Sequence, residues 1–144
     1  MNDAREPADN AICKLVETVR AADTAQAIST DANTRYPEVL STTRTIVLLE
    51  LAAGRLLAPL LGPGQLSVGV GVNVNHLAAT LPGAKVTAIA RYTGRIGKLY
   101  AFEVAAYDEA GEIMRGEHTR AIIDEARLLE SAKRRSGPVG STSA

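Results

Sequence analysis

Hydrophobic side chains alternate with polar or small ones through most of the second half of the chain. The alternation is clearest in residues 66–79, where Leu66 and the valines that follow it at every second position share one parity. A period of two is typical of a β-strand with one buried face. Three further segments are expected to be strands, residues 85–93, 99–107 and 113–124. Short stretches that contain glycine and charged residues, 94–97 and 108–111, predict hairpin turns between them.

A different pattern runs from residue 41 to residue 61, where apolar side chains fall on nearly every side of a helix. Ser41, Thr42 or Thr43 can cap its start, and the glycines and proline of residues 62–64 end it. A helix of about 19 residues is nearly 30 Å long, and one that is apolar all round is buried on most sides. The simplest arrangement is an α+β fold in which a curved antiparallel sheet wraps around one long central helix.

The two ends of the chain carry less regular patterns. Residues 1–10 are expected to form a flexible leader, and residues 11–30 a strand region, although their alanines also suit a helix. Residues 125–135 predict a short terminal helix, and the Gly/Ser-rich residues 136–144 are expected to be disordered. A single domain over residues 11–135 is therefore expected, which agrees with the chain length of 144 residues.

Composition argues against several classes of function. Basic and acidic residues number 16 each, and aromatic residues make up only 3% of the chain. No basic surface or stacking platform for nucleic acid is expected from these values. Cys13 is the only cysteine, so neither an internal disulfide nor a zinc cluster can be built around it. A lone thiol and an N-terminus without an apolar signal core favour a cytoplasmic protein.

One long weakly charged segment invites comparison with a membrane span. Between residues 56 and 85 the only titratable side chain is His76, and the length would suit a spanning helix. Glycines and prolines interrupt its first part, however, and the remainder alternates residue by residue. We therefore interpret the segment as a turn and a strand, with no membrane partner.

Glu50 is the first candidate for chemistry. It is the only acidic residue between Glu38 and Glu103, and it lies in the middle of an apolar helix. A carboxylate in such a place must be desolvated, paired or facing a cleft. An ion pair with Arg44 or Arg55 would explain it structurally, and a position in an active site would explain it equally well.

His76 and Thr42 are the other two candidates. His76 has the parity of the apolar residues in its strand, and an imidazole can exchange a proton near neutral pH, although a histidine on an apolar face is more often a satisfied core residue. Thr42 precedes Glu50 by a little over two helical turns and so lies on roughly the same side, but it could equally be the helix cap. His118 and Cys13 are interpreted as structural.

Three stretches together resemble a known family. They are Tyr36-Pro37-Glu38-Val39-Leu40-Ser41-Thr42, Leu49-Glu50-Leu51-Ala52, and the run from Val74 through His76 to Gly83, with Gly116 to Ile123 as a further match. The pattern is similar to that of hot-dog-fold thioesterases of the fluoroacetyl-CoA thioesterase type, over residues 14–130. The resemblance implies a homodimeric hot-dog fold with its active site at the subunit interface.

The resemblance also implies the chemistry, which is hydrolysis of a short acyl-CoA thioester. Glu50 would act as nucleophile or as base for water, His76 would polarise or carry a proton to the leaving thiolate, and Thr42 would position Glu50 or the water. Tyr36, Gly69 and Arg120 are the implied substrate-binding residues. No cofactor is implied, because coenzyme A is part of the substrate.

One segment departs from the family pattern. Fluoroacetyl-specific enzymes have bulky apolar residues before the helix, whereas residues 31–36 here are mostly polar. We therefore do not expect the enzyme to require fluorine. Two other functions fit the same residues. One is a hot-dog dehydratase or hydratase acting on acyl thioesters, and the other is a non-catalytic acyl-CoA-binding dimer module.

Overall fold

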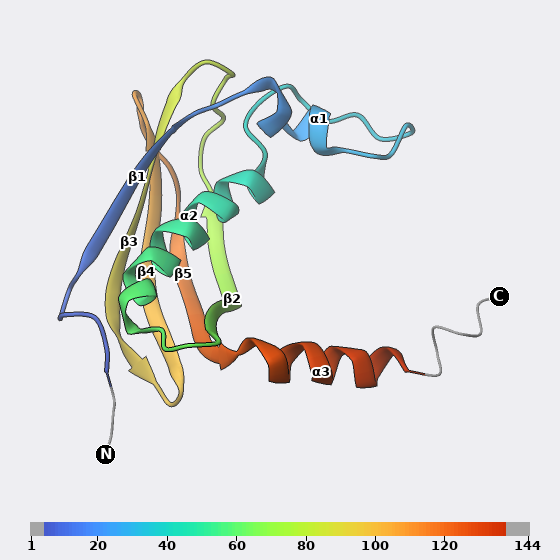
Figure 1. The fold of residues 1–144 in the computed structure, drawn as a ribbon. Helices are drawn as coiled ribbons and strands as arrows, with labels where there is room; N and C mark the ends of the chain where they lie inside the picture. Colours follow the sequence, from blue (N-terminus) through green and yellow to red (C-terminus); the bar gives the residue numbers. More distant parts are fainter. Residues whose placement is uncertain (1–4, 138–144) are drawn as a thin grey trace.

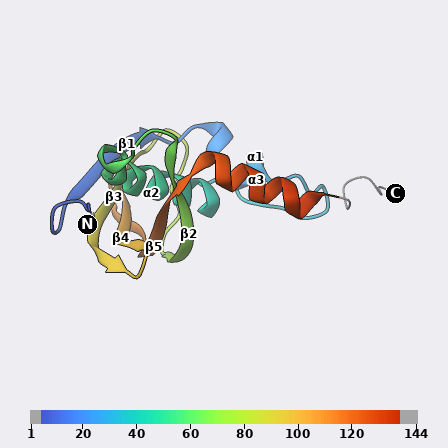
Figure 2. The same ribbon diagram turned by 60° about the horizontal axis from the view of Figure 1, so that its bottom comes forward.

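The computed structural model describes residues 5–137. Five antiparallel strands form one curved sheet in the spatial order β1-β3-β4-β5-β2, and a long helix lies against its inner face (Figures 1 and 2). The strands are β1 Ile12–Thr18, β2 Gln65–His76, β3 Lys85–Ile96, β4 Leu99–Asp108 and β5 Gly111–Asp124. The long helix is α2, Thr42–Leu57. The predicted α+β fold, a curved sheet around one long helix, is confirmed.

The core lies between α2 and the inner face of the sheet. Alternate residues of β3 and β4 turn toward the helix, and three of them are alanines with no exposed surface, Ala88, Ala90 and Ala106. These small side chains let the helix approach closely, so that its Leu48 and Leu49 are only 2% exposed. Burial of each leucine stabilises the fold by roughly 1.5–3 kcal/mol.

The opposite side of α2 is open, which corrects the expectation that the helix is buried on most sides. Val47 and Leu51 are 38% and 45% exposed. The sheet covers one side of the helix only, since its strands curve around that side without closing (Figure 2). An apolar surface on α2 is therefore left uncovered in the single chain.

The sheet also has an open apolar edge at β2. Val70 and Val72 of this edge strand are 56% and 44% exposed. Next to it, helix α3, Glu125–Ser136, leaves the end of β5 and extends past β2 (Figure 1). No residue of α3 is buried. The β2 edge and α3 together form the side of the molecule with the least internal cover.

Residues 11–30 form a strand only in their first half. After β1 the chain makes two short helical segments, η1 Ala21–Asp23 and α1 Ala25–Ile28. Thr24 begins the second of these, because its side-chain oxygen accepts the backbone N–H of Ala27 at 3.1 Å. The expected strand ends early because local side-chain hydrogen bonds turn the backbone at this point.

The remaining boundaries shift by a few residues. The predicted helix comprises α2 and the 3-10 turn η2, Ala58–Leu60, and β2 ends at His76 rather than at residue 79. β3 continues to Ile96, so the tight turn is made by Gly97, with φ 60°, and the residue after it. α3 includes Ser136 of the expected tail, and residues 138–144 lie outside the described part.

The expected leader has contacts where it is described. The hydroxyl of Tyr92 donates to Oε1 of Glu6 at 2.5 Å, and that of Tyr100 donates to the carbonyl of Arg5 at 3.3 Å. Residues 1–4 lie outside the described part. Among residues 5–137, no helix has the length and apolar character needed to cross a membrane.

Candidate active site

Thr42 is the first residue of α2, and its hydroxyl meets His76 at the end of β2. Thr42 Oγ1 and His76 Nδ1 are 2.8 Å apart. The cap of the helix is the preceding residue, Ser41, whose Oγ accepts the backbone N–H of Arg44 at 2.9 Å. The hydroxyl of Thr42 is therefore not used as the cap and is free to orient the imidazole.

A hollow of about 470 Å³ opens beside the Thr42–His76 pair, with Tyr36 on its wall. The second ring nitrogen of His76, Nε2, is buried and has no hydrogen-bond partner in the part of the chain that the structure describes. Buried polar atoms in proteins almost always have a partner. Nε2 is therefore the unsatisfied polar atom of this cluster.

Glu50 lies two turns further along α2 and pairs with Arg120 on β5. Arg120 Nη1 donates to Glu50 Oε2 at 3.4 Å. The Glu50 side chain is 37% exposed and that of Arg120 only 10%. Arg44 is not the partner, because it pairs with Glu17 and Asp23 instead. Arg55 takes part in none of the ion pairs found among residues 5–137. The carboxylate faces a hollow of about 370 Å³ that Arg120 also lines.

Gly69 makes room for this carboxylate. A Cβ atom built on Gly69 would overlap Glu50 Oε2, whereas one built on Gly71 would approach Thr119 instead. The β2–β5 register also shifts between these two glycines, which marks a β-bulge. Of the two strand glycines, Gly69 is therefore the one whose missing side chain the Glu50 carboxylate requires.

His118, which was interpreted from the sequence as a structural residue, and Ser67, which was not a candidate, also belong to this cluster. Arg120 donates from Nε to Ser67 Oγ at 3.0 Å and from Nη2 to the Ser67 carbonyl at 2.9 Å. His118 Nδ1 lies 2.8 Å from the carbonyl of Gly71, and its Nε2 lies 3.2 Å from Arg120 Nη1. The available signal was parity, since His118 and Arg120 are two residues apart on β5 and share a face.

The surroundings of His118 favour the neutral form of its imidazole. Burial lowers its pKa, and the positive charge of Arg120 lowers it as well, while the Gly71 carbonyl and Glu50 act in the opposite direction. Burial also lowers the pKa of Arg120, and Glu50 opposes this shift. A guanidinium is not deprotonated in proteins, so Arg120 stays charged beside His118.

The candidate residues thus form two clusters in a single chain. Thr42, His76 and Tyr36 lie near the start of α2, whereas Glu50, Gly69 and Arg120 lie near its middle. Within residues 5–137, no hydrogen bond or ion pair joins Glu50 to Thr42 or His76. Eight helical residues separate Thr42 from Glu50, which is about 12 Å along the axis.

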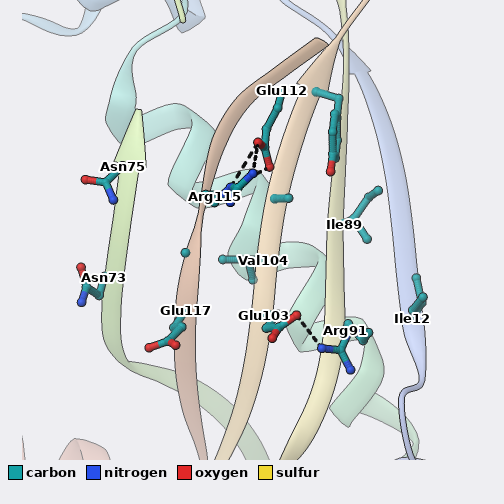
Figure 3. Close-up of a pocket in the computed structure, with 13 residues that line it drawn as sticks. Ile12, Asn73, Asn75, Ile89, Arg91, Glu103, Val104, Glu112, Arg115 and Glu117 are labelled. Atoms are coloured by element: carbon teal, nitrogen blue, oxygen red, sulfur yellow. Dashed lines mark hydrogen bonds and ion pairs between the residues drawn. The ribbon is translucent and has the colours of Figure 1, made fainter. Parts of the chain in front are cut away.

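The other face of the sheet has a hollow of about 600 Å³, which is lined by different residues. Figure 3 shows its side chains with α2 behind the sheet. Arg91 pairs there with Glu103 at 2.5 Å, and Arg115 pairs with Glu112 at 2.7 Å. None of the predicted site residues lines this hollow, and both arginines are already paired.

The fold of the chain is the hot-dog fold of the thioesterase structures that it resembles. More particularly, residues 19–126 match the model of a family described as fluoroacetyl-CoA-specific thioesterase, and the chain belongs to that family. The family resemblance noted in the sequence is confirmed. Among the described residues, no group of three or more His, Cys, Asp or Glu side chains could hold a metal ion.

Similar proteins agree with this family. The fluoroacetyl-CoA thioesterase of Streptantibioticus cattleyicolor is 41% identical over 88 residues, which are 61% of this chain and 63% of that protein. A mutant fluoroacetyl-CoA-specific thioesterase solved with fluoroacetate and CoA is 31% identical, with a TM-score of 0.80 over 83% of this chain and 98% of the other. A thioesterase superfamily member from Thermus thermophilus is 25% identical, with a TM-score of 0.82 over 96% and 99%.

Proposed function

We propose that this protein hydrolyses short-chain acyl-CoA thioesters to the free acid and CoA, with Thr42, Glu50 and His76 as the catalytic residues. The observation that carries this proposal is the placement of Glu50. Its carboxylate stands at an open hollow, above the backbone of Gly69 and against the guanidinium of Arg120. Membership in the thioesterase family supplies the class of substrate.

Two routes for Glu50 fit the same position. As a general base it takes a proton from water, the resulting hydroxide attacks the thioester carbon, and the C–S bond breaks. As a nucleophile it attacks that carbon itself, the C–S bond breaks as the CoA thiolate leaves, and water then hydrolyses the resulting anhydride. In both routes His76 gives a proton to the CoA thiolate, and its orientation comes from Thr42. CoA takes part as substrate, and the proposal requires no cofactor.

The neighbouring residues have binding roles in this proposal. The backbone at Gly69 lies beside the thioester carbonyl, and Arg120 lies near the acyl end. Tyr36 lines the hollow at Thr42 and His76, where it contacts the substrate. A fixed positive charge at Arg120 favours the negative charge that develops on the carbonyl oxygen during attack.

The two clusters come together when the protein is a homodimer. β2 is an edge strand with exposed valines, and exposed apolar edges tend to pair with another strand. A two-fold axis between Val72 and Asn73 would place Gly69 of one β2, over which the Glu50 carboxylate lies, opposite His76 of the other. Glu50 of one subunit would then approach the Thr42–His76 pair of its partner, in a cytoplasmic dimer with one site at each end of the seam.

Sedimentation and substitution at the edge test this assembly. We expect a dimer at micromolar concentration, and we expect Val70→Lys to shift it toward the monomer and to lower turnover together. Val16→Lys, an equally exposed valine on the opposite edge strand β1 (60% exposed), is the matched control. A wild-type monomer of 15.1 kDa with full activity would contradict the composite site.

A panel of acyl-CoA substrates read by release of free thiol tests the reaction itself. We expect CoA release from acetyl- and propionyl-CoA, and a loss of at least about 10²-fold in kcat for Glu50→Gln. Glu103→Gln is the matched control, because Glu103 also pairs with an arginine but lies on the other face of the sheet. Binding without CoA release, or hydration of an enoyl-CoA instead, would contradict the proposal.

A further inference from the structure

His118 is a buried polar residue that does not act as a reacting group in the proposed hydrolysis. It is 2% exposed and lies between the Gly71 carbonyl and the guanidinium of Arg120. On its other side the imidazole lies near the ring of Phe102, with centroids 6.3 Å apart. Both ring nitrogens therefore have protein partners, which leaves neither free to react with a substrate.

The two partners determine where the imidazole carries its proton. The Gly71 carbonyl can only accept a hydrogen bond, so Nδ1, at 2.8 Å, must donate. A guanidinium can only donate, so Nε2, at 3.2 Å from Nη1, must accept. A charged imidazole has no acceptor, and the other tautomer would set two donors against each other. His118 is thus the neutral Nδ1–H tautomer.

The same guanidinium nitrogen holds Glu50. Nη1 of Arg120 lies between His118 Nε2 and Glu50 Oε2, while Nε and Nη2 both donate to Ser67. Ser67 alone fixes one edge of the guanidinium, and His118 fixes the nitrogen that points to the carboxylate. The contact of 3.4 Å between Nη1 and Oε2 is the longest link in this chain.

The β-bulge supplies the fixed end of this series of hydrogen bonds. Gly69 pairs with Arg120 and Gly71 with Thr119, so Val70 is the extra residue of β2. An extra residue leaves backbone groups outside the regular ladder, and the Gly71 carbonyl turns to His118 instead. The one β-bulge thus places Gly69 under the Glu50 carboxylate. It also anchors the His118 imidazole, which fixes Arg120, the partner of that carboxylate.

We infer that His118 is a positioning residue of the active site. Its imidazole is a neutral acceptor anchored to the Gly71 carbonyl, and it fixes the orientation of the Arg120 guanidinium. Through Arg120 it fixes the position of the Glu50 carboxylate. The inference rests on the proposed function of Glu50 for its kinetic consequence. It assigns His118 a role in orientation and none in proton transfer to the substrate.

A double-mutant cycle measures whether His118 acts through Arg120. His118→Phe keeps a ring but removes both hydrogen bonds, and we expect kcat to fall by about 10²-fold, the scale of a small displacement of a reacting group, with little change in KM. In an Arg120→Met background the same substitution should cost less than about threefold, because coupled residues are not additive. An equal loss in both backgrounds, or full activity of the single variant, would overturn the inference.

Two further variants separate positioning from folding. His118→Gln offers one donor and one acceptor without a charge, so it should recover most of the activity that the phenylalanine variant loses. Tyr92→Phe removes the part-buried hydrogen bond from another side chain of the core to Glu6, and it should leave kcat and KM unchanged. If the glutamine variant is as impaired as the phenylalanine variant, or if the tyrosine variant is equally slow, His118 has only a structural role.

Nitrogen NMR of the imidazoles tests the tautomer without any substrate, and so separates this inference from the proposed reaction. In ¹⁵N-histidine-labelled protein at pH 7, the resonances absent from His118→Phe should show a protonated Nδ1 and an unprotonated Nε2. The charged groups that face this ring are Arg120 from β5 and Glu50 from α2. A proton on Nε2, or a charged ring at pH 7, would overturn the inference even if the enzyme hydrolyses every thioester offered.

Discussion

The Glu50 carboxylate occupies the space that a side chain on Gly69 would need, so that any Cβ atom at residue 69 would overlap its Oε2. The two residues come from different elements, α2 and β2, and are 19 positions apart in the sequence. Because the overlapping atom is the free end of a side chain, the carboxylate can yield by rotating. Rotation would break its contact with Arg120, which is the contact that fixes it.

Gly69→Ala should therefore impair catalysis more than folding. We expect kcat/KM to fall by about 10²-fold while the free energy of unfolding changes by no more than about 1 kcal/mol. Gly71→Ala adds the same methyl group two residues along β2, but toward Thr119, and it should retain more activity. The measurement is steady-state kinetics beside urea unfolding. A fully active Gly69→Ala variant would show that the position of the carboxylate does not limit the rate.

The alternation of hydrophobic and polar residues was sufficient to predict the strands of the sheet. It could not predict which side chains meet at the site. The strands were predicted because Val86, Ala88 and Ala90 repeat with a period of two on a surface that faces the core. The neighbour of each strand is not encoded in that period. The proximity of His118 to Gly71 follows from β5 pairing with β2 across a bulge, and neither the pairing nor the extra residue at Val70 changes the local pattern.

The hydrophobic pattern also could not predict those ends of helices and strands that side-chain hydrogen bonds determine. Thr24 begins a short helix in a stretch that was expected to be a strand, and Ser41 rather than Thr42 caps the long one. Three adjacent hydroxyl residues could each supply that cap, and the sequence does not rank them. The open side of α2 at Val47 and Leu51 is likewise invisible to a helical projection, because apolar residues look alike whether the sheet or a partner covers them.

The neighbouring hydroxyls Ser41 and Thr42 should separate stability from catalysis. Ser41→Ala removes the helix cap and should lower the free energy of unfolding by about 1 kcal/mol, with little effect on kcat. Thr42→Val removes the hydrogen bond to His76 and should lower kcat by at least about 10-fold, with unfolding nearly unchanged. Thermal unfolding and thiol-release kinetics on both variants check this. A reversed pattern would mean that Thr42 serves the helix and Ser41 the chemistry.

Stability should depend on pH through His118. Burial lowers its pKa in the folded protein, whereas in the unfolded chain it titrates near the ordinary value of about 6.5. Between these two values the unfolded chain binds more protons, so the free energy of unfolding decreases as pH falls. The slope is at most about 1.4 kcal/mol per pH unit for one group. The contribution of the neutral His118 to the free energy of unfolding is fully present above about pH 7 and is lost on acidification.

Urea unfolding between pH 7.5 and 5 measures this effect, with His118→Gln as the comparison. The amide does not titrate, so the variant should lack the part of the slope that the wild type owes to His118. The charges facing the ring, Arg120 and Glu50, are the same in both proteins. Identical pH dependence in the two proteins would show that His118 is protonated equally in the folded and unfolded states.

The shape of the hollow at Glu50 bears on the length of the acyl chain. Its wall is made by a short stretch of one helix, which includes Val47, Leu51 and Gly54 of α2, and by Arg120. A long fatty chain needs an extended groove, in which each buried CH₂ contributes about 0.8 kcal/mol. The chain has one phenylalanine and no tryptophan, so little bulky material is available to build such a groove.

We therefore expect short acyl groups to be favoured without a requirement for fluorine. The segment before α2 that could act as a lid, residues 31–35, is polar and exposed, and a dry lid would be the main means of telling fluoroacetyl from acetyl. Acetyl-, propionyl- and fluoroacetyl-CoA should have kcat/KM values within about two orders of magnitude, a span of roughly 2.7 kcal/mol. Steady-state comparison with C12 to C16 acyl-CoA substrates checks both points. Preference for the long chains would contradict the shallow hollow, and a fluoroacetyl preference far beyond that span would mean that a lid forms over the site despite its polar sequence.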